Sequence, residues 1–434
     1  MHFQNIISLS FFIAFSFQVF AQEVEIPLTR NPVVAKKYHE IKNSNLKINS
    51  VTLDTLPLPF LDDFSKENIY PDSSLWLDSN AFINRDYPIA PPTLGVATFD
   101  GVSKSGCPYD TTASATISLP ADTLTSKPIN LLSSTNIYLS FYWQAMGRGN
   151  RPDLGDSLVL EFLNPSLNQW NHIWSRDGYT ATSPPDSIFH LVIFPITDTA
   201  YLKNGFQFRF RNYATVSGNV DHWHIDYVYL DKNRSATDTI FDDVAFVYNS
   251  HSLLSNYYAM PWEQYNSSEM KTTLAFSIRN NNSVQKNVSI RDTIFDSSGG
   301  IQSTYGIFSD NILPGITNLP VFATPSVSTT PPNYVFPSLT KDTSFLLECV
   351  INTTPDKDRW NDTLRFTQIF NNYYAYDDGT VEAGYGLTCN PPCPPQQLAY
   401  KFTLNNPDVL YAVYMLFNWI PPGVNQQQFK IRIW

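Results

Sequence analysis

The chain has 434 residues and a formal net charge of −11 at neutral pH. This acidic balance argues against nucleic acid as a partner, because a phosphate backbone repels negative charge, and it leaves carboxylates available for a hard cation such as Ca²⁺. Aromatic residues make up 15% of the chain and there are 31 prolines, which favours strands over long helices and predicts an all-β fold in several domains.

Residues 1–21 contain no Asp, Glu, Lys or Arg, and an apolar run from Ile6 to Phe20 ends at the small residue Ala21. This pattern is typical of a secretory signal peptide. A membrane anchor is the alternative, but the run is shorter than the ~20 residues that a bilayer core requires. We therefore expect an exported protein, secreted or at the cell surface, with no membrane span in the mature chain. Residues 22–59 are polar and predict an exposed N-terminal arm.

Residues 60–235 show the strongest alternation of apolar and polar side chains. Phe206, Phe208 and Phe210 alternate with polar residues, and similar runs occur at 137–143 and 158–162. Alternation with a period of two indicates half-buried antiparallel strands, and the Gly, Asn and Pro residues between the runs supply turns. The segment therefore predicts a jelly-roll β-sandwich of the MAM-like or concanavalin-like kind.

Two further segments follow. Residues 237–371 predict an immunoglobulin-like or fibronectin-like β-sandwich, and residues 373–434 predict the front part of a second jelly-roll domain. Their alternating runs lie at 274–278, 288–290, 345–350, 363–366, 399–402, 411–417 and 429–434. The last run stops at Trp434 without a turn, so we expect either a longer native protein or a truncated copy.

Four cysteines occur, at positions 107, 349, 389 and 393. Cys389 and Cys393 are close enough in sequence to close a small loop with a disulfide in an oxidising compartment. Free thiols are one alternative. A zinc site is the other, although no histidine lies nearby to complete it.

Several stretches resemble large exported proteins of the Bacteroidetes phylum that are associated with type IX secretion. The matching stretches are LPFLDDFS at 58–65, GVATFDG at 95–101, ADTLTS at 121–126, DSLVLEF at 156–162, DHWHIDYV at 221–228, YDDG at 376–379 and LAYKF at 398–402. The resemblance implies a MAM-like or concanavalin-like jelly roll for the first domain and no particular activity. Such proteins usually end in a sorting domain, which residues 373–434 do not match.

Acidic residues near the two ends of the first domain are candidates for a structural calcium site. Asp62 and Asp63 open the domain, Asp226 lies in its closing run, and Asp100 lies between them in sequence. The first and last strands of such a sandwich often pair, and Ca²⁺ takes six to eight oxygens from carboxylates and carbonyls. The alternative is that these side chains accept hydrogen bonds from backbone amides in turns.

His222, His224 and Asp226 alternate along one run, a spacing that a two-histidine, one-carboxylate metal centre could use. Histidines in a core strand are more often satisfied within the protein. The chain has no Gly-x-Ser-x-Gly, His-Glu-x-x-His or Walker motif, and Glu161 stands alone in its strand without the second carboxylate of a glycosidase. We therefore expect no catalytic residues and no enzyme activity.

The function that this pattern favours is adhesion or ligand recognition. Loops at 147–156 and 180–188 are the expected contact regions, because rigid sheets position variable loops. Glycans or surface proteins are the expected partners, and the aromatic candidates for a sugar platform are Trp143, Trp170, Trp174 and Tyr179, unless these belong to the core. The alternative function is the carbohydrate-binding or targeting portion of an exported hydrolase whose catalytic domain lies beyond Trp434.

Overall fold

A computed structural model describes residues 22–44, 55–180, 183, 186–271, 274–321, 335–388, 397–419 and 428–434. Within these ranges the regular structure is nearly all strand, and α1 (Pro32–Asn43) is the one α-helix, which confirms the all-β prediction. Two short 3-10 helices, η1 (Trp262–Gln264) and η2 (Ser267–Glu269), accompany it. The predicted signal peptide and the predicted Cys389–Cys393 disulfide lie outside the described residues. Cys107 and Cys349 are free thiols.

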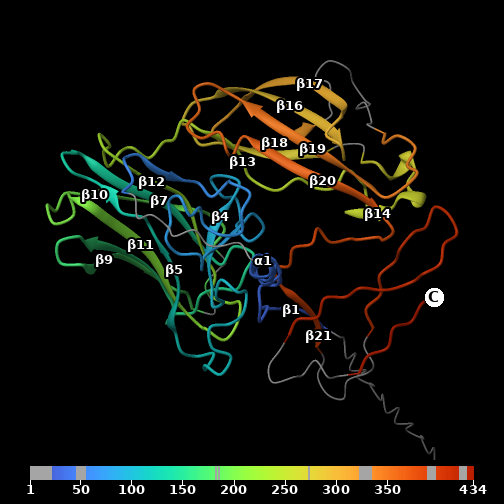
Figure 1. The fold of residues 1–434 in the computed structure, drawn as a ribbon, viewed down its shortest axis with the longest axis horizontal. Coiled ribbons are helices and arrows are strands. Elements are labelled where there is room, and N and C mark those ends of the chain that lie inside the picture. The colour runs from blue at the N-terminus through green and yellow to red at the C-terminus, as the bar shows by residue number, and fades with distance from the viewer. Residues whose placement is uncertain are drawn as a thin grey trace, which may run out of the picture.

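The first domain is a sandwich of two antiparallel sheets (Figure 1). Its strands are β2 (Phe60–Asp62), β3 (Phe82–Asn84), β4 (Val96–Phe99), β5 (Leu119–Thr125), β6 (Ile129–Asn130), β7 (Ile137–Ala145), β8 (Ser157–Asn164), β9 (Gln169–Asp177), β10 (His190–Ile196), β11 (Asn204–Ala214) and β12 (Trp223–Asp231). The six-stranded sheet has the order β10-β7-β12-β4-β3, with β2 paired to β12. The five-stranded sheet has the order β5-β11-β8-β9, with β6 paired to β11. The first and last strands of the domain pair, as expected.

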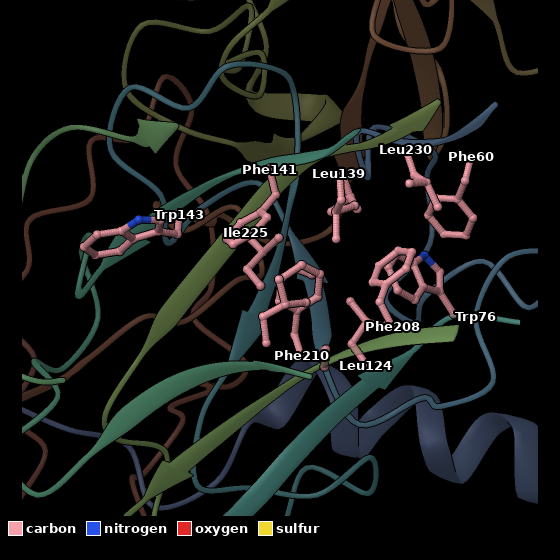
Figure 2. Packing of buried hydrophobic residues seen from close by; sticks show 14 of the residues in the cluster. Phe60, Trp76, Leu124, Leu139, Phe141, Trp143, Phe208, Phe210, Ile225 and Leu230 are labelled. Carbon is pink, nitrogen blue, oxygen red and sulfur yellow. The ribbon is translucent and has the colours of Figure 1, made fainter. Parts of the chain in front are cut away.

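Aromatic side chains from the two sheets fill the space between them (Figure 2). Phe208 of β11 lies edge-on to Phe60 of β2 and to Trp76, with ring centroids 5.2 and 5.7 Å apart. The next inward residue, Phe210, meets Phe141 of β7 at 4.8 Å. Full burial of each such ring stabilises the fold by roughly 1.5–3 kcal/mol. The alternation in the sequence therefore marks the inner face of this sandwich correctly.

Both faces of β12 are buried, because another layer covers the outer side of its sheet. Tyr227 and Tyr229 pack on Phe241, which follows the strand, with ring centroids 4.4 and 6.2 Å apart. The guanidinium of Arg234 lies 4.2 Å from the centre of the Tyr229 ring. This layer connects the first sandwich to the second.

The second domain is also a sandwich. Its strands are β13 (Val244–Phe246), β14 (Ala259–Pro261), β15 (Leu274–Asn280), β16 (Lys286–Asp296), β17 (Ile301–Ile312), β18 (Gly315–Val321), β19 (Thr343–Asn352) and β20 (Thr363–Asn371). A three-stranded sheet, β13-β15-β18, faces a five-stranded sheet, β14-β20-β19-β16-β17. Its core includes Phe246, Phe276, Phe345 and Phe370. The four runs predicted for this domain all lie within strands.

The predicted N-terminal arm contains β1 (Gln22–Ile26) and α1 rather than extended chain alone. Asn31 caps α1, since its side chain accepts a hydrogen bond from the amide of Val34 at 3.1 Å, and Pro32 fits the first helical turn. The helix start docks on Gly106, where a Cβ would lie 2.4 Å from the Asn31 carbonyl oxygen. The polar composition of residues 22–59 does not predict this helix, because the helix depends on the Asn31 cap and on the contact with Gly106.

The strands predicted at 399–402, 411–417 and 429–434 are not strands in the structure. Among the described residues after the second sandwich there is one strand, β21 (Gly384–Thr388), and it pairs with β1 (Figure 1). Tyr411 and Tyr414 are 99% and 92% exposed, so these side chains are not packed in a hydrophobic core. An alternating run becomes a strand only when a neighbouring strand pairs with it, and none does so here among the described residues.

Candidate functional site

The four aspartates predicted to bind calcium lie in three separate places. Asp62 accepts hydrogen bonds from Trp76 Nε1 at 2.6 Å and from the Phe64 amide at 3.0 Å, and burial raises its pKa to about 7. Asp100 accepts from the Val102 amide at 2.6 Å, and burial raises its pKa to about 8. Both carboxyls are therefore satisfied locally, at different positions in the first sandwich.

Asp63 and Asp226 are the two that lie near each other. The hydroxyl of Thr93 is 3.0 Å from the Asp63 carbonyl oxygen and 3.1 Å from Asp226 Oδ1. Asp226 also accepts from the amides of Thr93 and Tyr227, at 3.0 and 2.6 Å. Asp63 Oδ1 accepts from the amide of Ser65 at 3.1 Å. The predicted calcium set is thus not assembled at one point, because turn and strand amides hold these carboxyls where they are.

A different set of acidic side chains converges. Among the described residues, Asp153, Asp156 and Asp221 bring three ligand atoms within 4.8 Å of one another. Asp156 accepts hydrogen bonds from Ser118 Oγ and, at 2.6 Å, from the amide of Asp153, while Asp221 accepts from the amide of Thr215 at 2.8 Å. Burial, together with the charge of Asp156, raises the pKa of Asp221 to about 7. Protein donors therefore engage much of this triad.

The triad lies where the two predicted contact loops meet. The amide of Tyr179 donates to Pro152 O and that of Gly178 donates to Asp156 O, both at 2.9 Å. Gly178 has no room for a side chain, because a Cβ there would lie 2.0 Å from the Asp153 carbonyl oxygen. Arg151 Nη1 also donates to the Thr180 carbonyl oxygen at 3.0 Å, so residues 147–156 are joined to residues 178–180, where the second predicted contact loop begins. Residues 181–182 and 184–185 of that loop lie outside the described residues.

Aromatic and charged side chains border this loop surface. The ring of Trp143 stacks on His190 with centroids 4.6 Å apart, and Asp186 lies 3.0 Å from His190 Nε2. The guanidinium of Arg176 is 5.5 Å from the ring centre of Trp143 and equally far from that of Tyr179. Tyr179 also donates through its hydroxyl to Asp186 at 3.3 Å. Arg176 is exposed and Tyr179 half-buried, whereas the Asp186 side chain is 9% exposed, so this corner offers a cation and a ring, with a nearly buried carboxylate behind them.

The other sugar-platform candidates are placed differently. Trp143 is 6% exposed and belongs to the core, as the alternative interpretation held. Trp174 packs edge-on against Phe141 inside the sandwich, with centroids 5.4 Å apart. Trp170 lies on the outer face of the five-stranded sheet under the guanidinium of Arg209, which also pairs with Glu161 at 2.5 Å.

His222 and His224 do not form a metal centre with Asp226. His222 lies 2.8 Å from the Asn150 amide through Nδ1 and 2.9 Å from Asn219 Oδ1 through Nε2. His224 makes its ring contacts to Thr98 Oγ1 at 2.8 Å and to a backbone carbonyl. Burial lowers the pKa of His222 to about 3 and that of His224 to about 4, so both rings are neutral and structural.

Sequence reasoning found the loops but missed the residues that meet there. Asp153 and Asp156 stand in the predicted contact loop, and their carboxyl spacing in Asp-Leu-Gly-Asp is a signal that could have been used. Asp221 comes 65 positions after Asp156 in the sequence. It reaches Asp153 and Asp156 because it lies in the turn that connects β11 to β12. No local pattern encodes that approach.

No protein-family model matches the chain, and no curated relative matches it. Solved structures that resemble it in part include a β-glucuronidase from Bacteroides uniformis, with 13% identity, TM-score 0.22, and coverage of 57% of this chain and 26% of that one. The Endo-D glycoside hydrolase domain from Streptococcus pneumoniae has 8% identity, TM-score 0.27, and coverage of 73% and 43%. A GH2 β-galacturonidase from Eisenbergiella tayi has 10% identity, TM-score 0.26, and coverage of 73% and 44%. TM-scores of this size do not establish a common fold.

Within the part of the chain that the structure describes, no helix combines the length and the apolar character that a membrane crossing needs.

Proposed function

We propose that the chain is a non-catalytic, exported β-sandwich protein that binds a ligand or a partner surface through the joined loops of its first sandwich. The observation that carries the proposal is the hydrogen bonding of residues 147–156 to residues 178–180, which joins the first contact loop to the stretch where the second begins. Loops held on a rigid sheet scaffold are a common location for binding residues. The resemblance to type IX-associated Bacteroidetes proteins and the apolar run at 6–20 support export to the cell surface or the medium.

Glycans are the ligand class that the exposed guanidinium of Arg176 and the half-buried ring of Tyr179 suit best. A tyrosine ring stacks on the apolar face of a sugar, while guanidinium and carboxylate groups hydrogen-bond its hydroxyls. The exposed carboxylate of Asp153 lies on the neighbouring loop and extends the polar rim. These groups can stack on a sugar ring and hydrogen-bond its hydroxyls, and such contacts are sufficient for binding without catalysis.

A glycan array probed with the full chain tests the proposal. Tyr179→Ala should abolish binding to any glycan that the wild type retains. Tyr213→Ala is the matched control, because Arg211 lies 5.4 Å from the Tyr213 ring centre on the outer sheet face, much as Arg176 lies 5.5 Å from Tyr179. Equal binding by the Tyr179 variant, or no glycan or surface-protein ligand at all, would refute the proposed site. Release of shortened glycan by the wild type would refute the non-catalytic assignment.

A further inference from the structure

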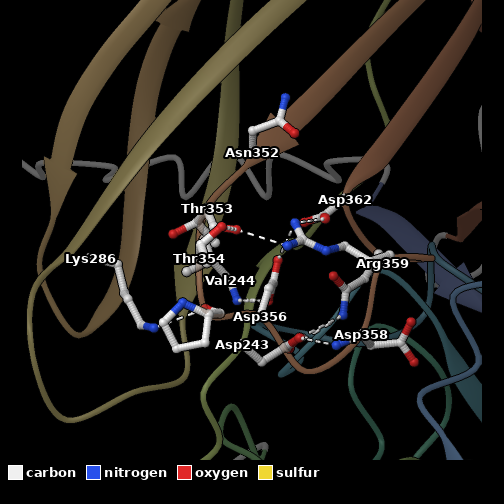
Figure 3. Close-up of polar contacts among 12 residues, drawn as sticks. Asp243, Val244, Lys286, Asn352, Thr353, Thr354, Asp356, Asp358, Arg359 and Asp362 are labelled. Carbon is white, nitrogen blue, oxygen red and sulfur yellow. Dashed lines mark hydrogen bonds and ion pairs between the residues drawn. The ribbon is translucent and has the colours of Figure 1, made fainter.

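Buried acidic side chains gather where the two sandwiches touch, a region that we call the junction. Asp63 and Asp226 come from the first sandwich, and Asp243 and Asp362 from the second; each is at most 3% exposed. The side chain of Asp356 is fully buried beside them. Figure 3 shows the part of the junction that the second sandwich supplies, including Asp243, Asp356 and Asp362. The junction therefore gathers five carboxyl groups away from water, and burial raises the pKa of each of them.

A single amide group separates the two carboxylates that face each other across the junction. Asn361 Nδ2 lies 2.9 Å from Asp63 Oδ2 and 3.3 Å from Asp243 Oδ2. Asp63 follows β2 in the first sandwich, whereas Asp243 and Asn361 precede β13 and β20 in the second. The position of that nitrogen is thus within reach of acidic oxygens from both sandwiches.

Arg359 is the counter-charge of Asp356 and Asp362, at one side of the junction, and Arg85 is engaged outside it. Arg359 is 53% exposed in its side chain and lies 3.2 Å from Asp356 Oδ2 and 3.0 Å from Asp362 Oδ2 (Figure 3). Arg85 donates to a backbone carbonyl at 2.7 Å. Among the described residues, no basic nitrogen lies within 4.0 Å of the carboxylates of Asp63, Asp226 or Asp243. Leaving a buried carboxylate without a counter-charge costs several kcal/mol.

Two further buried oxygens at the junction, Tyr227 Oη and Asn361 Oδ1, have no hydrogen-bond partner within the part of the chain that the structure describes. Both residues are completely buried. The charges of Asp243 and Asp63 add to burial in raising the pKa of Tyr227, which places its hydroxyl among these carboxylates. An unpaired buried oxygen costs about 1–3 kcal/mol. Unpaired oxygens beside uncompensated carboxylates are what a site lacking its bound ion would show.

We propose that the junction binds a divalent hard cation, with Ca²⁺ as the best match, held by Asp63 of one sandwich and by Asp243 and Asn361 of the other. All donors are oxygens, which favours Ca²⁺ over zinc or copper. Turning the Asn361 amide by 180° exchanges its nitrogen and oxygen, so Oδ1 faces the cation and its present lack of a partner is relieved. The ion would fix the two sandwiches to each other, a role separate from ligand recognition by the loops.

Calcium titration of the chelator-treated full chain tests the site, by calorimetry and by thermal unfolding. We expect saturable binding that raises the Tm, and Asp243→Asn should weaken the Kd at least about tenfold while keeping the side-chain shape. Asp156→Asn is the matched control, because it removes a buried carboxyl from the loop triad and should leave the Kd unchanged.

Asn361→Asp adds a carboxylate to the site, whereas Asp243→Asn removes one. This second variant keeps the proposal testable even if Asp243→Asn does not fold. A third carboxylate should tighten the Ca²⁺ Kd at least about tenfold and lower the Tm of the chelator-treated protein. The proposal is overturned if the wild type binds no Ca²⁺ at millimolar concentration, if Asp156→Asn alone abolishes binding, or if Asn361→Asp leaves the affinity unchanged.

Discussion

Replacing Asp62 by asparagine should change how the stability of the protein depends on pH. Burial raises the pKa of Asp62 from 3.8 to about 7 in the folded protein. The folded state therefore holds a proton that the unfolded chain releases, so the free energy of unfolding falls as pH rises from about 4 to about 7 and then levels off. A shift of this size corresponds to about 4 kcal/mol in total, of which roughly 2–3 kcal/mol falls between pH 5 and pH 8.

The asparagine side chain of this variant carries no charge at any of these pH values and resembles the protonated acid. The free energy of unfolding of Asp62→Asn, relative to wild type, should thus rise by roughly 2–3 kcal/mol from pH 5 to pH 8. Urea denaturation followed by tryptophan fluorescence measures this, since Trp76 lies in contact with the carboxyl at 2.6 Å. Asp110→Asn is the control, because that exposed residue has a lowered pKa and titrates below pH 5. A difference that stays constant with pH would refute the account of Asp62.

Three other substitutions test the packing of the first sandwich. Phe208→Ala should lower its free energy of unfolding by about 3–5 kcal/mol in urea denaturation, whereas Leu167→Ala, at a residue 68% exposed, should change it by less than about 0.5 kcal/mol; equal effects would contradict the assigned core. Gly95→Ala should lower the Tm measured by calorimetry, because φ is +146° and a Cβ would lie 2.3 Å from the Phe64 carbonyl oxygen. An unchanged Tm would exclude this close approach. Arg234→Met should lower the free energy of unfolding by about 2–4 kcal/mol, since Arg234 is 6% exposed and its loss leaves the carbonyl oxygen of Tyr229 without a charged donor. Urea denaturation that shows an unchanged stability would mean that this hydrogen bond is dispensable.

The sequence predicted the strands whose side chains alternate and whose partners lie in the same domain. β7, β8 and β11 are examples, because one buried face imposes a period of two on each of them. The runs near Tyr400 and Tyr411 have the same pattern and form no strand, since a strand also requires a partner that local sequence does not specify. α1 was missed because its signals are a cap at Asn31 and a docking contact, not apolar periodicity.

The candidate sites were less predictable than the strands. The loop regions at 147–156 and 180–188 were identified from turn chemistry, yet the triad depends on Asp221, which the turn before β12 brings to them. Asp63 was predicted as a calcium ligand together with Asp62, Asp100 and Asp226. Its neighbours across the junction, Asp243 and Asn361, could not be predicted, because Asp243 belongs to another domain and Asn361 is uncharged. Contacts between domains follow from how whole sandwiches pack, which no short motif records.

The pairing of β1 with β21 depends on the folding of the two sandwiches that lie between these strands in the sequence. Five residues on each side form this two-stranded ribbon, which is too small to be stable in isolation. Its closure depends on folded sandwiches that bring two distant stretches of chain to one place, because bridging a long unfolded loop carries an entropic cost. Unfolding of either sandwich should therefore separate β1 from β21 and expose the backbone amides of both strands to hydrogen exchange.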